Sequence, residues 1–210
     1  MLGRVTYPGM FFQHDAETGR YDDVPRGKGW IGPSPRYRKI EKLEKDPLFL
    51  QHIQLPLFQQ LAQAVLGPSV KLCRAVLFTK AATGGTELPW HQDGGSFWGL
   101  SRDPVLQIWT ALDDAPVESG CVELIPGSHL QGLATPLGGV IPDDVAARNT
   151  SPRLLVPARA GEALLLHNYC WHRSGVNTTG LPRRAFTICY LDAATTCTRR
   201  RSPRSFLPLF

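Results

Sequence analysis

A histidine and a carboxylate lie two residues apart in the segment WHQDGG (90–95). If residues 88–93 form a strand, His91 and Asp93 point to the same face, because strand side chains alternate with a period of two. Such a pair supplies two of the three ligands in the facial triad of non-haem Fe(II) sites, which a second histidine completes. The two glycines that follow are expected to leave room for a ligand.

The third ligand must come from elsewhere in the chain, and His172 is the favoured candidate. Arg183 follows it by 11 residues, a distance that allows a hairpin to return the guanidinium to the metal. Arginine is suited to bind a carboxylate through two parallel hydrogen bonds. His167 is the rival ligand, although a buried, hydrogen-bonded histidine is the simpler account of it. The other histidines considered are His14, His52 and His129.

Zinc is the rival metal for this site. Closed structural zinc sites prefer four protein ligands that include cysteine. The five cysteines are scattered and form no C-x-x-C pattern, which fits neither a zinc-thiolate site nor a disulfide framework. We therefore interpret them as reduced thiols in a reducing compartment.

Short strands are the elements that must position these residues. Twenty glycines and 18 prolines separate short apolar or alternating runs, a pattern typical of an antiparallel sandwich or barrel. Helical signals are confined to residues 38–67, where Asp46 and Pro47 begin one helix and a second runs from Pro56 to Gly67. The expected strands cover about residues 70–80, 88–93, 104–113, 121–125, 153–157, 162–167 and 184–191.

The length of 210 residues predicts one domain with extensions. We divide it into an irregular N-terminal arm (1–38), the main domain (39–192) and a basic C-terminal tail (193–210). The Gly- and Pro-rich segment 130–152 is long for a compact domain, and such loops often form a lid over a site.

The net charge of +5 falls to +1 without the tail, which carries four arginines and no acid. A solvated tail is favoured over one that touches phosphates or lipids. We therefore expect neither a nucleic-acid partner nor a membrane partner. No apolar run approaches the ~20 residues of a membrane helix, and the first 15 residues lack a signal-peptide pattern. The expected location is cytoplasmic.

Five segments carry a resemblance to a known family through their order and spacing. They are PWHQDGG (89–95), IWTALDD (108–114), SGCVELIPGSH (119–129), AGEALLLHNYCWHRSGVN (160–177) and PRRAF (182–186). Together they resemble the phytanoyl-CoA dioxygenase family of Fe(II)/2-oxoglutarate oxygenases. The segment KIEKLEKDPLFLQHIQLP (39–56) resembles the helical region that precedes the barrel of that family. The resemblance thus covers about residues 39–191.

This resemblance implies a mainly β fold, the double-stranded β-helix or cupin-like jelly roll, with a few N-terminal helices. It implies Fe(II) bound by His91, Asp93 and His172, with 2-oxoglutarate and O2 as cosubstrates. Related halogenases replace the carboxylate with a small residue, so an intact Asp93 implies hydroxylation and not halogenation.

The resemblance also implies residues that bind 2-oxoglutarate. Arg183 matches the residue on its distal carboxylate, while Ser174 and Lys39 match positions that assist it. Trp109 matches an aromatic residue of the pocket wall. Gln107 is added because it shares a strand face with Trp109. No catalytic residue beyond the metal ligands is expected.

The favoured function is a dioxygenase that hydroxylates an unactivated C–H bond of a small-molecule or acyl substrate and releases succinate and CO2. Only 38 residues precede Lys39, fewer than the family usually has. This motivates an alternative, a non-catalytic jelly-roll protein that binds a metal or ligand. A weaker alternative is a metal-dependent enzyme that does not use 2-oxoglutarate. Substrate identity and oligomeric state are left open.

Overall fold

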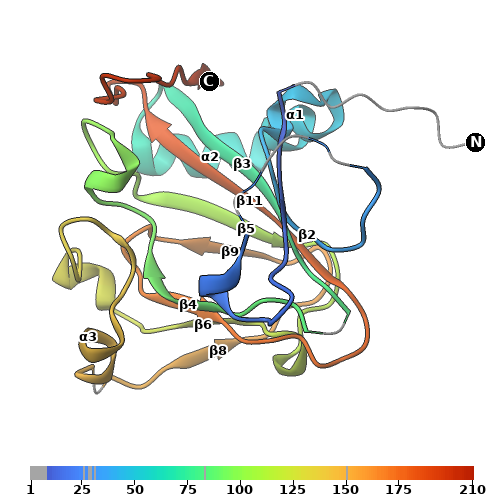
Figure 1. Ribbon diagram of the computed structural model, residues 1–210. Helices are drawn as coiled ribbons and strands as arrows, with labels where there is room; N and C mark the ends of the chain where they lie inside the picture. Colours follow the sequence, from blue (N-terminus) through green and yellow to red (C-terminus); the bar gives the residue numbers. More distant parts are fainter. Residues whose placement is uncertain (1–8, 26, 28–29, 31, 83, 150) are drawn as a thin grey trace, which may run out of the picture.

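The computed structural model of the protein describes residues 9–25, 27, 30, 32–82, 84–149 and 151–210. In this part of the chain, the strands form two sheets that face each other in two layers (Figure 1). Neighbouring strands pair antiparallel in both sheets. From β3 to β11 the chain passes repeatedly from one sheet to the other. This is the jelly-roll arrangement, and it confirms the predicted mainly β fold.

The larger sheet has the strand order β1-β2-β3-β11-β5-β9, and β12 also pairs with β3. Its long central strands, β3 and β11, are rich in the β-branched and aromatic residues that favour strands. The strands are β1 (Phe11–His14), β2 (Tyr37–Glu41), β3 (Val70–Lys80), β5 (Leu106–Ala111), β9 (Ala163–Leu166), β11 (Arg183–Asp192) and β12 (Leu207–Pro208).

The smaller sheet has the order β7-β4-β10-β6-β8. Its central strands, β4 and β10, are direct neighbours, and His172 pairs with His91 across them. The short strand β10 is absent from the sequence-based expectation, because three residues are too few for a recognisable period. The strands are β4 (Leu88–Gln92), β6 (Val122–Leu124), β7 (Gly139–Val140), β8 (Leu154–Val156) and β10 (His172–Ser174).

Two helices, α1 (Pro47–Ile53) and α2 (Pro56–Leu66), cover the outer face of the larger sheet (Figure 1). Helix α1 begins as predicted, since the Asp46 side chain accepts a hydrogen bond from the backbone N–H of Leu48 at 2.9 Å. In α2 the buried residues Phe58 and Ala62 are four positions apart and therefore share one face. They pack with residues of β3, β5 and β11 in the main core.

The other helical elements are short. Helix α3 (Asp143–Ala147) lies beside the smaller sheet (Figure 1). None of the helices in the described residues is long and apolar enough to cross a membrane. The 3-10 turns span Tyr21–Asp23, Leu43–Lys45, Ser96–Trp98, Val117–Ser119 and Ser128–Gln131.

Tyr190 joins the helical layer to the sheet. Its side chain is fully buried, and its hydroxyl donates to the carbonyl of Ile53 at 2.9 Å. Tyr190→Phe leaves that buried carbonyl without this donor, so we expect the free energy of unfolding to fall by about 1–2 kcal/mol. Urea denaturation measures this loss. Tyr21→Phe is the matched control, because the Tyr21 hydroxyl has no hydrogen-bond partner among the described residues; equal losses in both variants would contradict the prediction.

The N-terminal arm differs from its prediction as an irregular segment. Residues 11–14 form β1, and residues 37–41 form β2, which extends the larger sheet from β3. The sequence pattern is weak here because β1 and β2 are short and gain their order by pairing with strands distant in sequence. Lys39 consequently lies in a strand and not in the helical region assigned to residues 39–56. Residues 1–8 of the arm lie outside the described part.

A β-bulge interrupts the pairing of these two strands. Gln13 pairs with Lys39, and His14 pairs with Tyr37. Arg38 therefore has no residue opposite it in β1. A bulge of this kind bends the strand and redirects the extra side chain.

Part of the basic tail packs against the domain, while Arg199, Arg200 and Arg201 are exposed, as expected of a solvated segment. Strand β12 pairs with β3. The guanidinium of Arg204 donates to the carbonyl of Trp98 at 2.7 Å, and that of Arg199 donates to the carbonyl of Phe97 at 2.8 Å. These arginines bind backbone carbonyls of the domain, a role that a cluster of basic residues in a sequence does not reveal.

Candidate metal centre

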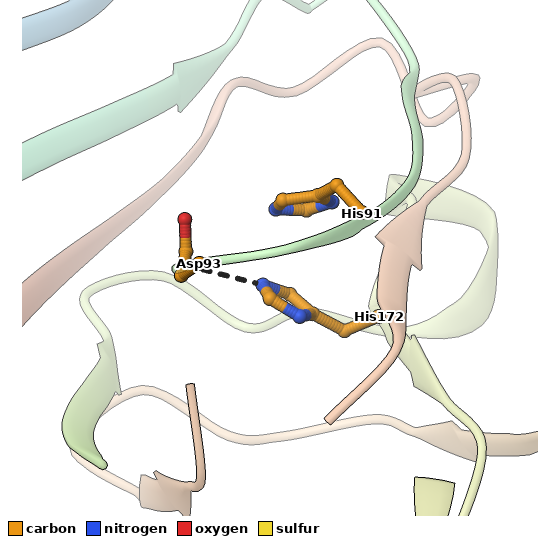
Figure 2. Close-up of side chains that lie close together, drawn as sticks. All are labelled: His91, Asp93 and His172. Carbon is orange, nitrogen blue, oxygen red and sulfur yellow. Dashed lines mark ion pairs between the residues drawn. The ribbon is translucent and has the colours of Figure 1, made fainter. Parts of the chain in front are cut away.

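The two histidines and the aspartate of the predicted triad lie together. One ligand atom from each of His91, Asp93 and His172 can be chosen so that all three lie within 4.8 Å of one another. Figure 2 shows the two imidazole rings side by side, with Asp93 facing His172; Nε2 of His172 is 3.6 Å from Oδ2 of Asp93. No other such group of metal-ligating side chains occurs in the described residues. His167 lies elsewhere, against His129, with ring centroids 4.9 Å apart.

Hydrogen bonds fix which imidazole nitrogen faces the centre. Nδ1 of His91 lies 3.0 Å from the carbonyl of Pro89, and Nδ1 of His172 lies 2.8 Å from the carbonyl of Cys170. A carbonyl only accepts, so each Nδ1 must carry the proton. Each Nε2 then has a free lone pair, as a metal ligand needs. The donor set therefore fits an iron ion.

Two side chains donate hydrogen bonds to the Asp93 carboxylate, and neither interaction was predicted from the sequence. Nη2 of Arg74 donates to its Oδ1 at 3.0 Å, and Nε2 of Gln107 donates to its Oδ2 at 3.0 Å. Hydrogen bonds of this kind orient a ligating carboxylate. Arg74 also stacks over the ring of Trp98 at 4.4 Å from the centroid. The carbonyl of Trp98 is the group that Arg204 binds, so the C-terminal tail braces this side of the centre.

The electrostatic environment favours the protonation states that metal binding requires. Burial, and then the neighbouring His172, lower the pKa of His91 to about 3, which keeps its imidazole neutral. Burial alone would raise the pKa of Asp93. The Arg74 guanidinium and the two histidines outweigh burial and hold that pKa well below its usual range. At neutral pH, Asp93 is thus an ionised carboxylate, and His91 is a neutral imidazole that can donate a lone pair to a metal.

A cavity of about 160 Å³ lies between the two sheets and includes all three ligands. The other predicted site residues also line it, namely Lys39, Gln107, Trp109, Ser174 and Arg183. The cavity is therefore the place where the sequence-predicted residues meet.

Arg183 and Arg184 are clearly distinguished by the structure. Arg183 is 3% exposed, lines the cavity and donates through Nη2 to the carbonyl of Gly120 at 2.7 Å. Its Nε is buried without a hydrogen-bond partner in the described residues. Arg184 is exposed and forms an ion pair with Asp113 at 2.7 Å. Of these two arginines, only Arg183 can reach a ligand in the cavity.

The remaining predicted residues have different surroundings. The ring of Trp109 lies under the Arg183 guanidinium at 5.8 Å. Ser174 is buried at the end of β10. Lys39 forms an ion pair with Glu41. Gln107 binds Asp93 directly, so its amide reaches the metal ligand as well as the cavity.

The two glycines after Asp93 have a packing role that differs from the expected one. A Cβ on Gly94 would lie 2.6 Å from the Tyr169 ring, and one on Gly95 would lie 2.6 Å from the backbone of Leu137. Gly95 also has a φ of +90°. These glycines therefore allow chain segments to pack closely, and they do not provide space for a ligand.

Segment 130–152 differs from the expected lid. Its strand β7 pairs with β4, and Ile141 packs against Trp171 and Ile125. Among the described residues of this segment, none lines the cavity. It is therefore anchored to the smaller sheet by backbone pairing and apolar contacts.

Four basic residues of the cavity were not predicted from the sequence: Arg38, Arg74, Lys80 and Arg173. A charged residue within an apolar strand is a signal for Arg74 and Lys80, since isolated buried charges are rare. Arg38 gives no such signal, because the direction of its side chain depends on the β-bulge between β1 and β2.

Lys80 should reduce the stability of the fold. Burial first, and then Arg183 and Arg38, lower the pKa of Lys80 to about 7, while Asp15 and Glu87 oppose the shift. The unfolded chain binds this proton more tightly, so wild-type stability should rise between pH 7 and pH 10.5. Lys80→Met should therefore stabilise the protein, by roughly 2–3 kcal/mol more at pH 6 than at pH 9. Urea denaturation of both proteins at both pH values measures this; an equal effect at the two would refute it.

The fold and the centre define a jelly-roll protein with two histidines and one carboxylate at a cavity between its sheets. Residues 34–185 match the family described as Phytanoyl-CoA dioxygenase (PhyH). The chain belongs to this family.

Relatives and solved structures agree with this assignment. The chain is 32% identical over 195 residues to Phytanoyl-CoA dioxygenase domain-containing protein 1 of Danio rerio, covering 86% of this chain and 65% of that protein. It is 30% identical over 172 residues to L-proline trans-4-hydroxylase of Streptomyces griseoviridis, covering 69% and 63%. The chain thus spans somewhat less than two thirds of these relatives.

A solved structure has the same fold. The epimerase SnoN, crystallised with Fe3+, alpha ketoglutarate and nogalamycin RO, superposes with a TM-score of 0.60 at 26% identity. The match covers 81% of this chain and 69% of that one.

Proposed function

We propose that the protein is an Fe(II)/2-oxoglutarate-dependent oxygenase that hydroxylates a C–H bond of a small molecule and releases succinate and CO2. The observation that carries this proposal is the position of His91, Asp93 and His172, whose ligand atoms lie within 4.8 Å in a cavity that also contains Arg183. Family membership, the hydroxylase relative and the ligands of SnoN support the same chemistry.

The residues would divide the work as follows. His91, Asp93 and His172 would bind the iron, with Gln107 and Arg74 orienting the carboxylate of Asp93. When bound, iron supplies the activation of dioxygen that couples the oxidative decarboxylation of 2-oxoglutarate to oxidation of the substrate.

The chain would hold 2-oxoglutarate through its own side chains. Arg183 would bind the distal carboxylate, because its guanidinium is buried in the cavity and its Nε is unpartnered. Ser174 would add a hydroxyl donor, Trp109 would form the wall, and Lys39 would contribute positive charge from β2. Burial of these groups keeps water from the reacting atoms.

An anaerobic titration tests the proposal. Purified protein with Fe(II) is titrated with 2-oxoglutarate while the visible spectrum is recorded. A weak charge-transfer band is expected, absent in His172→Ala. Absence of the band in wild-type protein that is folded by circular dichroism would reject the 2-oxoglutarate assignment.

Gln107→Leu should weaken Fe(II) binding about tenfold, because Asp93 loses one of the hydrogen bonds that orient it. Anaerobic calorimetry with Fe(II) measures the affinity. Thr110→Val is the control on the same strand: Thr110 is buried, and its hydroxyl has no partner in the described residues. An unchanged affinity in Gln107→Leu would show that Asp93 needs no such support.

A further inference from the structure

The cavity contains more positive charge than its own carboxylates balance. Three of its basic side chains have a carboxylate partner: Lys39 pairs with Glu41, Arg74 with Asp93 and Arg173 with Glu123. Three others have no carboxylate oxygen within 4.0 Å in the described residues: Arg38, Lys80 and Arg183.

These three side chains are buried at one end of the larger sheet. Their strands, β2, β3 and β11, are adjacent in the order given. Arg183 pairs directly with Lys80 across β11 and β3. Arg38 is 8% exposed, Lys80 is 6% exposed and Arg183 is 3% exposed, so a counter-ion can reach them only through the cavity.

Each cation has only neutral hydrogen-bond acceptors. The Lys80 ammonium donates to the carbonyl of Thr86 at 2.6 Å, and Arg38 donates to the side-chain amide oxygen of Gln13 at 3.0 Å. Arg183 donates to a backbone carbonyl, as described above. Buried cations without an ionic partner are unfavourable, and burial lowers the pKa of all three.

The β-bulge places Arg38 in this group. In a regular strand, Arg38 and Lys39 would point to opposite faces. Because Arg38 is the extra residue of the bulge, both side chains line the same cavity. The bulge therefore adds a second basic residue of β2 to the site, at the loss of one regular pairing position.

A count of charges shows what is missing. Arg38 and Arg183 carry two positive charges, and Lys80, whose pKa is about 7, carries only part of a third at neutral pH; the buried Asp15 supplies one negative charge near Arg38 and Lys80. The distal carboxylate of 2-oxoglutarate would add one more at Arg183. Part of a positive charge remains, and of the two guanidinium groups Arg38 is the one that neither the cosubstrate nor a carboxylate of the described residues contacts.

We propose that the substrate carries a carboxylate and that Arg38 binds it, at the β2 side of the cavity, with β3 between Arg38 and Arg183. This inference rests on the proposed function and specifies its substrate class. The planar guanidinium suits a carboxylate. Tyr21 lines the cavity beside Arg38, with its ring 5.3 Å from the guanidinium carbon, and would form the wall of this subsite.

Calorimetry without turnover tests the inference. Protein with Mn(II) is first titrated to saturation with 2-oxoglutarate and then with propionate or its neutral analogue propionamide. Propionate should bind at least about tenfold more tightly than propionamide, because a hydrogen bond between two charged groups is stronger than one to a neutral amide. Arg38→Gln should remove this preference and leave 2-oxoglutarate affinity within about twofold. Arg38→Lys should retain part of it.

The control is Arg148→Gln, which removes one positive charge from a surface ion pair with Asp144. This substitution should change neither the affinity for 2-oxoglutarate nor the affinity for propionate. Equal binding of propionate and propionamide to the wild type, or a preference that persists in folded Arg38→Gln, would overturn the inference while the proposed function stands. Failure of the first titration, that of 2-oxoglutarate, would overturn the proposed function and the inference with it.

Discussion

Asp93→Ala is expected to abolish metal binding at the centre and to lower succinate formation by a factor of about 10³ or more. The loss of one of three ligands removes several kcal/mol of metal-based stabilisation, and each 1.4 kcal/mol is about a tenfold change in rate. The substitution has a second effect, because Arg74 loses its ionic partner. An uncompensated, partly buried guanidinium should also lower the melting temperature.

Two variants separate these effects. His172→Ala removes a ligand but leaves the Arg74–Asp93 ion pair in place, so metal binding should be lost with little change in melting temperature. The double variant Asp93→Ala with Arg74→Met should recover stability and remain inactive. Metal content after dialysis against Fe(II) and a succinate assay are the measurements. Substantial succinate formation by Asp93→Ala or by His172→Ala would show that these residues do not form the catalytic metal centre.

Arg183→Gln is expected to raise the dissociation constant of 2-oxoglutarate about 100-fold, equivalent to about 2.7 kcal/mol. Arg183 is the cavity-lining arginine of β11, and no protein carboxylate in the described residues satisfies it. Removal of its charge leaves the distal carboxylate of the cosubstrate without an ionic partner.

The neighbouring residue provides a matched control. Arg184→Gln removes the same charge one position along β11, but Arg184 points outward to Asp113. The affinity for 2-oxoglutarate should stay within about twofold. Anaerobic titration of the charge-transfer band measures both variants. If Arg184→Gln caused the larger loss, the cosubstrate would bind at the outer surface of β11, and the orientation proposed here would be wrong.

Strand alternation is a local rule, so the sequence could place two of the three proposed ligands together, whereas His172 was assigned from the family resemblance. His91 and Asp93 needed only their spacing to share a face. Alternation alone does not distinguish Arg183 from Arg184, because it says that the two side chains face opposite sides of the strand but not which one faces inward. The sheet register decides this, since Arg183 lies opposite Lys80 in β3.

Other features depend on contacts between distant segments and were not predictable. Strand β1 is defined by pairing with β2, and the role of Arg38 depends on one extra residue in that pairing. Arg74 was overlooked because its partner Asp93 lies 19 positions later in the sequence. Gly94 and Gly95 were misjudged for a similar reason, as they accommodate Tyr169 and Leu137.

The contact between Arg204 and Trp98 has a consequence for how the protein is made. A series of contacts runs from Arg204 to Trp98, to Arg74 and to Asp93. During synthesis the ribosome releases residues 91–98 well before residue 204, so the nascent chain cannot complete this series until the tail has emerged. The full set of contacts behind Asp93 is therefore complete only after translation. A messenger RNA with a stop codon just after residue 192 would yield a chain that has His91, Asp93 and His172 but lacks Arg204, the first contact in the series that reaches Asp93.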